Sequence, residues 1–221
     1  MKICITIICC LISLVIFSQK GIVYIGLGTS YEEVKYVYNT QIQVSSDIKY
    51  ENEDQICYGL TFTYQPSDNL SITSGALLSS LNIMKDYNWF YIDQGDLLIP
   101  RSTTVKADYL RVPLMVGKRI GNGKIEFMPS AGFNFDILVK STETSIFEFN
   151  NERESNYFEL GFRNPHTFFT VDFLVSINTS DKISIGIAPY LNQGLNVLND
   201  QITGRGESNF GGRFNVSYKL K

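Results

Sequence analysis

Five charged residues lie on the polar face of otherwise apolar, alternating segments: Arg111, Glu126, Asp136, Asp172 and Arg213. Both signs are present, and charges taken out of water must pair with one another to offset their lost hydration. We therefore predict that these side chains form a hydrogen-bonded structural network inside the fold. The network requires neither a metal nor a cofactor, and we predict neither.

The single histidine, His166, restricts the catalytic chemistry that the chain could perform. A site with several histidine ligands is excluded, and a Ser-His-Asp set would depend on this one residue. A hydrogen-bonded structural role for His166 is the main expectation, so we predict no catalytic residues and no enzyme. A lipid-acting enzyme that uses His166 and Asp172 remains an alternative.

Two segments that we expect to be loops could contact a partner. The first, residues 87–91, is rich in aromatic side chains, which can anchor a protein or a glycan or pack across the mouth of a barrel. The segment 32–55 carries five carboxylates, which indicate a solvated acidic rim, with binding of divalent or lipopolysaccharide-bound cations as an alternative. The aromatic contact residues are Tyr87, Trp89, Phe90 and Tyr91, and the acidic residues are Glu32, Glu33, Glu51, Glu53 and Asp54.

Charge and the N-terminal residues narrow the class of protein. A formal net charge of −3 provides no basic surface for nucleic acid. Residues 1–18 combine a basic start, an apolar run and a terminal serine, which predicts a cleaved signal peptide and leaves residues 19–221 as one domain. Three of the four cysteines lie in that leader, so only Cys57 would remain and no internal disulfide could form.

Alternation at period two dominates the chain from Gly21 onward, and no window shows a helical stripe. A long example runs from Lys124 to Ile137, where Ile, Phe, Pro and Ala alternate with residues that, apart from Met128, are polar or small. The pattern predicts eight strands, and an even number suits a closed barrel. The strands are expected at residues 22–31, 56–65, 69–80, 105–119, 124–138, 166–178, 182–193 and 208–220.

The expected connections alternate between short and long. Tight turns are expected at 65–69, 120–124 and 178–182, where Gly, Asn and Asp tolerate positive φ. Long loops are expected at 32–55, 81–104, 139–165 and 194–207. This asymmetry is typical of an eight-stranded antiparallel up-and-down transmembrane β-barrel with four long extracellular loops, located in a bacterial outer membrane.

Side-chain size indicates which face points inward. The polar face carries many Gly, Ser and Thr residues, which suit the crowded interior of an eight-stranded barrel better than a solvated exterior. A secreted soluble barrel with an apolar ligand inside shows the same period and remains an alternative. Aromatic residues near strand ends are typical of girdles at the two interfaces, although strand propensity alone would also place them there: Tyr31, Tyr58, Tyr64, Tyr109, Tyr190, Phe210 and Tyr218.

Two consecutive strands carry a family resemblance. The segment Tyr109-Leu-Arg-Val-Pro-Leu-Met-Val-Gly117, a Gly-Asn-Gly turn, and Phe127-Met-Pro-Ser-Ala-Gly-Phe133 follow one another. Together they resemble the PorT-like outer-membrane β-barrel family of Bacteroidota. The resemblance implies the barrel fold, and a secretion or envelope assembly as one possible setting, but it assigns no functional residue.

From these observations we expect a non-enzymatic, monomeric outer-membrane protein whose barrel is a scaffold for loops that bind a partner or protect the envelope. Its partners would be outer-membrane lipid and, through the loops, envelope or secretion proteins. A second hypothesis is that the protein is a component of a secretion or envelope assembly.

Overall fold

The structure is a computed structural model, and eight stretches of the chain are described. The leader and three of the four aromatic contact residues, Trp89, Phe90 and Tyr91, lie outside them, so those predictions remain untested. The fourth, Tyr87, is the last residue of a strand that was expected to have ended earlier. The described residues are 21–33, 48–52, 55–87, 102–121, 123–146, 153–154, 165–195 and 208–220.

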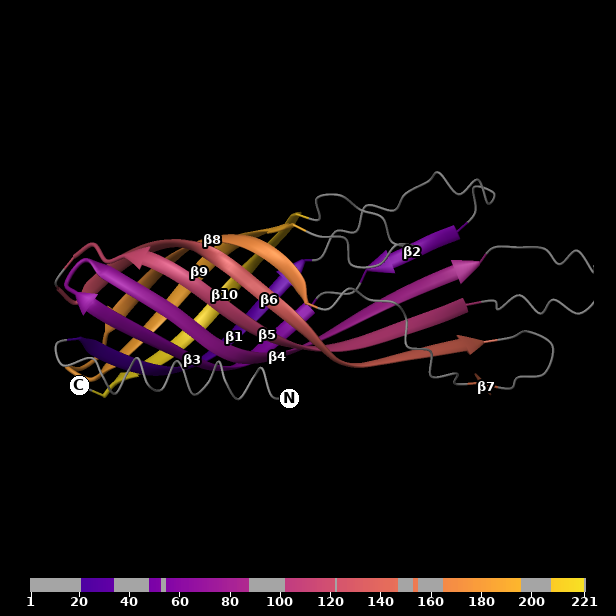
Figure 1. Ribbon diagram of the computed structural model, residues 1–221, viewed down its shortest axis with the longest axis horizontal. Helices are drawn as coiled ribbons and strands as arrows, with labels where there is room; N and C mark the ends of the chain where they lie inside the picture. The colour runs from indigo at the N-terminus through magenta and orange to yellow at the C-terminus, as the bar shows by residue number, and fades with distance from the viewer. Residues whose placement is uncertain are drawn as a thin grey trace, which may run out of the picture.

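Eight antiparallel strands close into a barrel, which confirms the predicted fold class (Figure 1). Each strand pairs with its neighbours in sequence order, and the first strand pairs with the last, so no edge is left open in the wall. No helix among the described residues is long and apolar enough to cross a membrane. The barrel strands are β1 (Ile22–Glu33), β3 (Gln55–Ser67), β4 (Leu70–Tyr87), β5 (Ser102–Lys118), β6 (Ile125–Ile146), β8 (His166–Asn178), β9 (Ile183–Gly194) and β10 (Ser208–Lys219).

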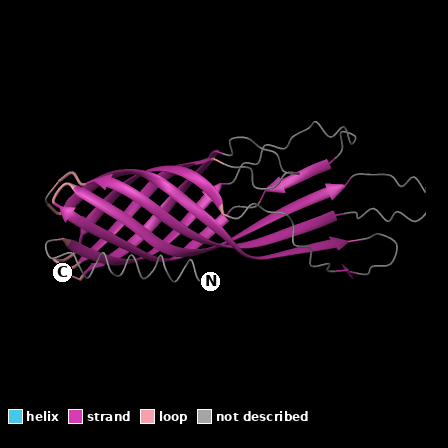
Figure 2. Ribbon diagram, viewed as in Figure 1, coloured by secondary structure: helices cyan, strands magenta, loops and turns pink. Residues whose placement is uncertain are grey.

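Three tight turns lie at one end of the barrel, beside the start of β1 and the end of β10 (Figure 2). They connect β3 to β4, β5 to β6 and β8 to β9. Gly121 lies in the β5–β6 turn with a φ of 100°, a conformation that glycine adopts without steric cost. We call this the short-turn end and the opposite end the long-loop end.

The outer surface of the barrel is apolar and the lumen is mostly polar, although a few apolar side chains such as Phe168 also lie inside. Large apolar side chains remain exposed on every barrel strand, among them Leu27, Leu60, Leu114 and Phe133. The pattern of burial is therefore the reverse of that in a soluble protein, since Ser, Thr, Asn and ionic groups lie inside. A closed barrel with this distribution is suited to a lipid bilayer.

The apolar band ends well before three of the strands do. On β4 it runs from Leu70 to Leu78, and nine residues that rise about 3.3 Å each with a tilt of about 40° span roughly 23 Å, close to the thickness that such bands have. Beyond it, β4, β5 and β6 continue as a paired sheet to Tyr87, Ser102 and Ile146.

We call this extension the protruding sheet: residues 81–87 of β4, 102–107 of β5 and 140–146 of β6. Two short strands border it, β2 (Ile48–Asn52) beside β4 and β7 (Arg153–Glu154) beside β6 (Figure 1). The prediction of loops throughout 81–104 and 139–165 is therefore wrong for these residues, and the prediction of a loop throughout 32–55 is wrong for β2. Outside the hydrocarbon a strand needs no apolar outer face. The alternation of apolar and polar residues therefore stops there, although the strands remain paired.

Candidate functional site: the polar lumen

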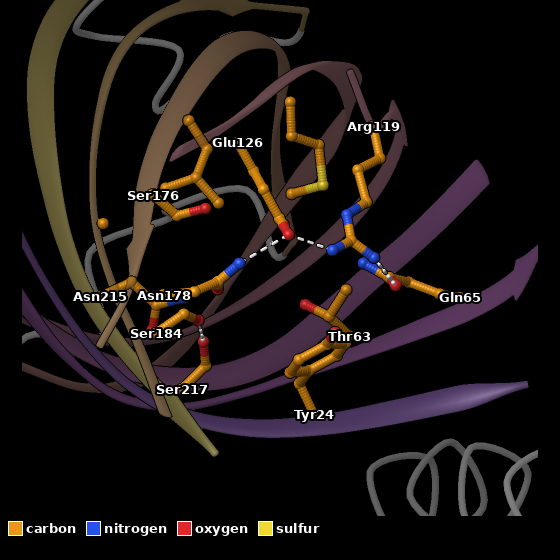
Figure 3. Close-up of a pocket in the computed structure, with 13 residues that line it drawn as sticks. Tyr24, Thr63, Gln65, Arg119, Glu126, Ser176, Asn178, Ser184, Asn215 and Ser217 are labelled. Carbon is orange, nitrogen blue, oxygen red and sulfur yellow. Dashed lines mark hydrogen bonds and ion pairs between the residues drawn. The ribbon is translucent and has the colours of Figure 1, made fainter. Parts of the chain in front are cut away.

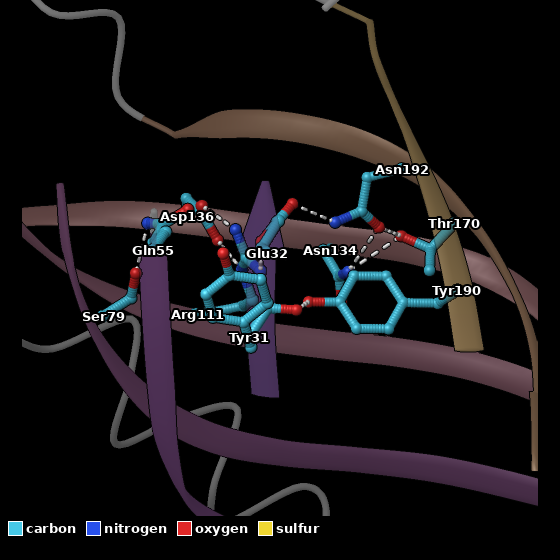
Figure 4. Close-up of polar contacts among 10 residues, drawn as sticks. All are labelled: Tyr31, Glu32, Gln55, Ser79, Arg111, Asn134, Asp136, Thr170, Tyr190 and Asn192. Carbon is cyan, nitrogen blue, oxygen red and sulfur yellow. Dashed lines mark hydrogen bonds and ion pairs between the residues drawn. The ribbon is translucent and has the colours of Figure 1, made fainter. Parts of the chain in front are cut away.

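A buried ion cluster lies inside the barrel toward the long-loop end (Figure 4). Arg111 donates to both oxygens of Asp136, with Nε–Oδ1 at 2.7 Å and Nη2–Oδ2 at 2.8 Å, and its Nη1 lies 2.6 Å from Glu32 Oε2. All three residues are at most 3% exposed. Because the three come from β5, β6 and β1, the cluster links opposite parts of the wall through charge-assisted hydrogen bonds.

Amide and hydroxyl groups extend this cluster across the lumen. Asn192 Nδ2 donates to Glu32 Oε1 at 2.5 Å, and Thr170 Oγ1 donates to Asn192 Oδ1 at 2.6 Å. Asn134 Nδ2 lies 2.8 Å from Thr170 Oγ1. We call Glu32, Arg111, Asn134, Asp136, Thr170 and Asn192 the loop-side layer. It occupies the lumen with side chains that satisfy one another.

A second ion pair lies nearer the middle of the barrel. Arg213 Nη2 donates to Asp172 Oδ2, and Ser130 Oγ donates to Asp172 Oδ1. Asp172 is 3% exposed, and each of its two carboxylate oxygens accepts one of these hydrogen bonds. This middle pair joins β10, β8 and β6.

A third cluster surrounds a pocket at the short-turn end (Figure 3). Arg119 pairs with Glu126 and donates to Gln65 Oε1 at 3.1 Å, and Asn178 Nδ2 donates to Glu126 Oε1 at 2.7 Å. Burial of the guanidinium opposes its protonation, but the Glu126 carboxylate outweighs this and raises the pKa of Arg119. The pocket encloses about 520 Å³ with its mouth included, and its remaining lining is mostly hydroxyl and amide groups.

The structure places all five predicted network residues in the lumen, but in three separate groups. Arg111 lies with Asp136, Asp172 with Arg213, and Glu126 with Arg119, which was not among the predicted residues.

Two charged network residues were missed, Glu32 and Arg119, and so were the amide and hydroxyl groups that join the clusters, such as Asn192. Glu32 was assigned to the solvated acidic rim, and this was wrong, because its side chain is fully buried against Arg111. Gly26, Gly28 and Ser30 of β1 face inward, and the same alternation directs Glu32 inward. The predicted strand ended one residue before Glu32. Arg119 likewise shares the inward parity of Arg111 on β5.

His166 and Asp172 both point into the lumen but do not form one site. They lie six residues apart on β8, which corresponds to about 20 Å along a strand. His166 is 2% exposed and packs edge-on against Phe168, with 4.3 Å between the ring centroids. Within the described residues, no three His, Cys, Asp or Glu side chains converge on a metal position.

Two of the aromatic residues that were expected at interfacial girdles are inside the barrel. Tyr109 and Tyr190 are 2% and 6% exposed. Tyr190 lies over its cross-strand neighbour Gly211, and a Cβ there would come within 2.5 Å of the Tyr190 ring. The Tyr190 ring can therefore occupy this position only because the residue opposite it is a glycine.

We expect Gly211→Val to displace the Tyr190 ring and to destabilise the barrel by about 1 to 3 kcal/mol, because the added atoms overpack the lumen. Gly212→Val is the matched control, since a Cβ at Gly212 meets no atom within 4 Å. The urea midpoint of each folded variant, measured by gel migration without boiling, checks the difference. Equal midpoints would contradict the packing role of Gly211.

Comparison with known proteins supports the fold. No protein-family model matches the sequence, and no curated protein is significantly similar to it in sequence. Outer membrane protein OprG from Pseudomonas aeruginosa aligns over 92% of this chain and 97% of its own, with a TM-score of 0.50 and 14% identity. The chain has the fold of small outer-membrane barrels.

Two further solved structures align over a similar length. Outer membrane protein W of E. coli covers 91% of this chain and 99% of its own, with a TM-score of 0.48 and 13% identity. Ail of Yersinia pestis, an attachment invasion locus protein, covers 91% and 100%, with a TM-score of 0.43 and 14% identity. At this identity the similarity concerns the fold alone.

Proposed function

We propose that the chain is a non-enzymatic outer-membrane barrel that serves as a scaffold for a surface-exposed platform. The observation that carries this proposal is the continuation of β4, β5 and β6 beyond the apolar band as the protruding sheet. The lumen beneath it holds three groups of paired side chains, which support the wall rather than a reaction. The platform then binds a partner or protects the envelope.

The polar lumen argues against a secreted barrel with an apolar ligand inside. Such a barrel would bury an apolar cavity, whereas Arg111, Asp136 and Asp172 lie within this one. The distance along β8 between His166 and Asp172 likewise argues against an enzyme that uses both. Membership of the PorT-like family and partners from a secretion assembly remain proposals that rest on the sequence resemblance.

Shortening the platform tests the proposal. Ser80 pairs with Asp108, so replacing residues 81–107 by an Asn-Gly turn should close the hairpin without a change of register. We expect the shortened protein to enter the outer membrane and to keep heat-modifiable migration on gels. It should fail to restore envelope resistance or surface attachment to a strain that lacks the gene.

The intact chain and the variant His166→Ala with Asp172→Asn are the controls for this complementation. Full complementation by the shortened barrel would overturn the platform role and direct attention to the short-turn end, as expected for a component of an assembly. Loss of complementation in the doubly substituted variant, with the barrel still folded, would instead indicate catalysis.

A further inference from the structure

Two exposed lysines lie side by side on the outer wall, just beyond the apolar band. Lys106 of β5 and Lys140 of β6 are both exposed, and β5 and β6 pair along this stretch. Lys140 lies opposite Asp108, two residues from Lys106, so the lysines are diagonal neighbours with Cα atoms about 7 to 8 Å apart. Neither lysine forms an ion pair with any side chain that the structure describes.

A β-bulge turns Lys140 outward. Tyr109 pairs with Leu138 and Asp108 with Lys140, so Val139 has no partner on β5. Residues that pair across a ladder share a face, and Lys140 therefore lies on the outer face with Asp108. Without the bulge, the alternation through Asp136 and Leu138 would direct Lys140 to the inner face. Bulges at barrel rims commonly redirect a side chain in this way.

The position of the lysines along the barrel fixes their level in a membrane. The outermost row in which β4, β5 and β6 are all apolar is Leu78, Leu110 and Ile137. The next row is Ser80, Asp108 and Lys140, and it is mixed, because the exposed Ile56 and Val139 lie beside these polar residues. Ser80 Oγ donates to Asp108 Oδ1 in that row. The Lys140 ammonium thus lies where hydrocarbon gives way to lipid headgroups, and Lys106 lies one row further out, beside Thr142.

We propose that Lys106 and Lys140 form a binding site for the phosphorylated headgroup of an outer-leaflet lipid of the lipid A type. The site spans two rows of the sheet, which suits a headgroup with more than one phosphate on a sugar backbone better than a single phosphodiester. Hydroxyl groups of Ser80 and Thr142 border it, and the protruding sheet continues above it. The proposal rests on the proposed function, in which the long-loop end lies outside the cell.

Native mass spectrometry of the full-length barrel in detergent tests the site, with bis-phosphorylated lipid A and its dephosphorylated form as probes. We expect the wild-type protein to retain the phosphorylated form preferentially. Lys106→Gln with Lys140→Gln should weaken that retention roughly 25-fold, since each lysine near an anionic surface contributes about fivefold. Asp108→Asn should strengthen it, because a nearby negative charge is removed.

Lys124→Gln with Lys182→Gln is the matched control, since both lysines are exposed at the short-turn end. It makes the same change in net charge and should leave retention unchanged, and heat-modifiable migration shows that each variant is folded. The proposal is overturned if the control weakens retention equally, if both probes bind alike, or if phosphatidylglycerol or inorganic phosphate displaces lipid A at equal concentration. Failure of the platform in the complementation experiment would leave this binding result unaffected.

Discussion

Replacing Arg111 with Met is expected to lower the free energy of unfolding by about 3 to 5 kcal/mol, the usual cost of leaving buried charge without its partner. Arg111 makes three hydrogen bonds to Asp136 and Glu32, and both carboxylates are buried. The methionine would fill most of the space but would leave two carboxylates close together. Urea titration in phospholipid vesicles, with the folded fraction read from gel migration, measures the loss.

The variant that combines Arg111→Met with Glu32→Gln and Asp136→Asn isolates the electrostatic cause. It removes the ion cluster while keeping its shape, and exchanging a whole buried ion cluster for neutral groups is often close to neutral in stability. We therefore expect it to be more stable than Arg111→Met alone. Equal losses in the two variants would show that the packing of Arg111, including its position 5.6 Å from the Phe168 ring centroid, accounts for the effect.

Leu114→Arg is expected to destabilise the barrel in vesicles by about 2 to 4 kcal/mol, because Leu114 lies in the middle of the apolar band. Leu114 faces outward on β5, between Ser74 of β4 and Phe133 of β6. A cation there would lie near the centre of the hydrocarbon. The same urea titration in vesicles measures the effect.

Leu70→Arg is the matched control for depth. Leu70 and Leu114 are 41% and 45% exposed, but Leu70 lies opposite Lys118 at the short-turn end of the band. There we expect a cost of at most about 1 kcal/mol. A barrel surrounded by water would tolerate both substitutions within about 0.5 kcal/mol, so equal and small effects would exclude a lipid-facing wall.

The strand positions could be predicted from the sequence because alternation is a local signal. Within β8 and β10 the predicted and observed ranges agree to within a residue, since the whole of each strand crosses the apolar band. In β4 and β6 the predicted strand ended seven and eight residues too early. Those residues lie outside the band, where no lipid requires an apolar outer face.

The inward face of each strand was also accessible from the sequence, which is why all five charged residues could be placed in the lumen. Their partners could not be predicted. Arg111 and Glu32 are 79 residues apart, and they meet only because β1 and β5 lie across a closed ring. Which side chains share a level depends on strand tilt and register, and neither is encoded within a single strand.

The sequence by itself determined an all-β chain with one apolar and one polar face, because period-two alternation follows directly from strand geometry. Only the tertiary structure decided the rest: the three lumen groups, the length of the protruding sheet and the direction of Lys140. The unpaired Val139 shows the reason most directly. One extra residue reverses every following side chain, and its presence is defined only by the strand that pairs beside it.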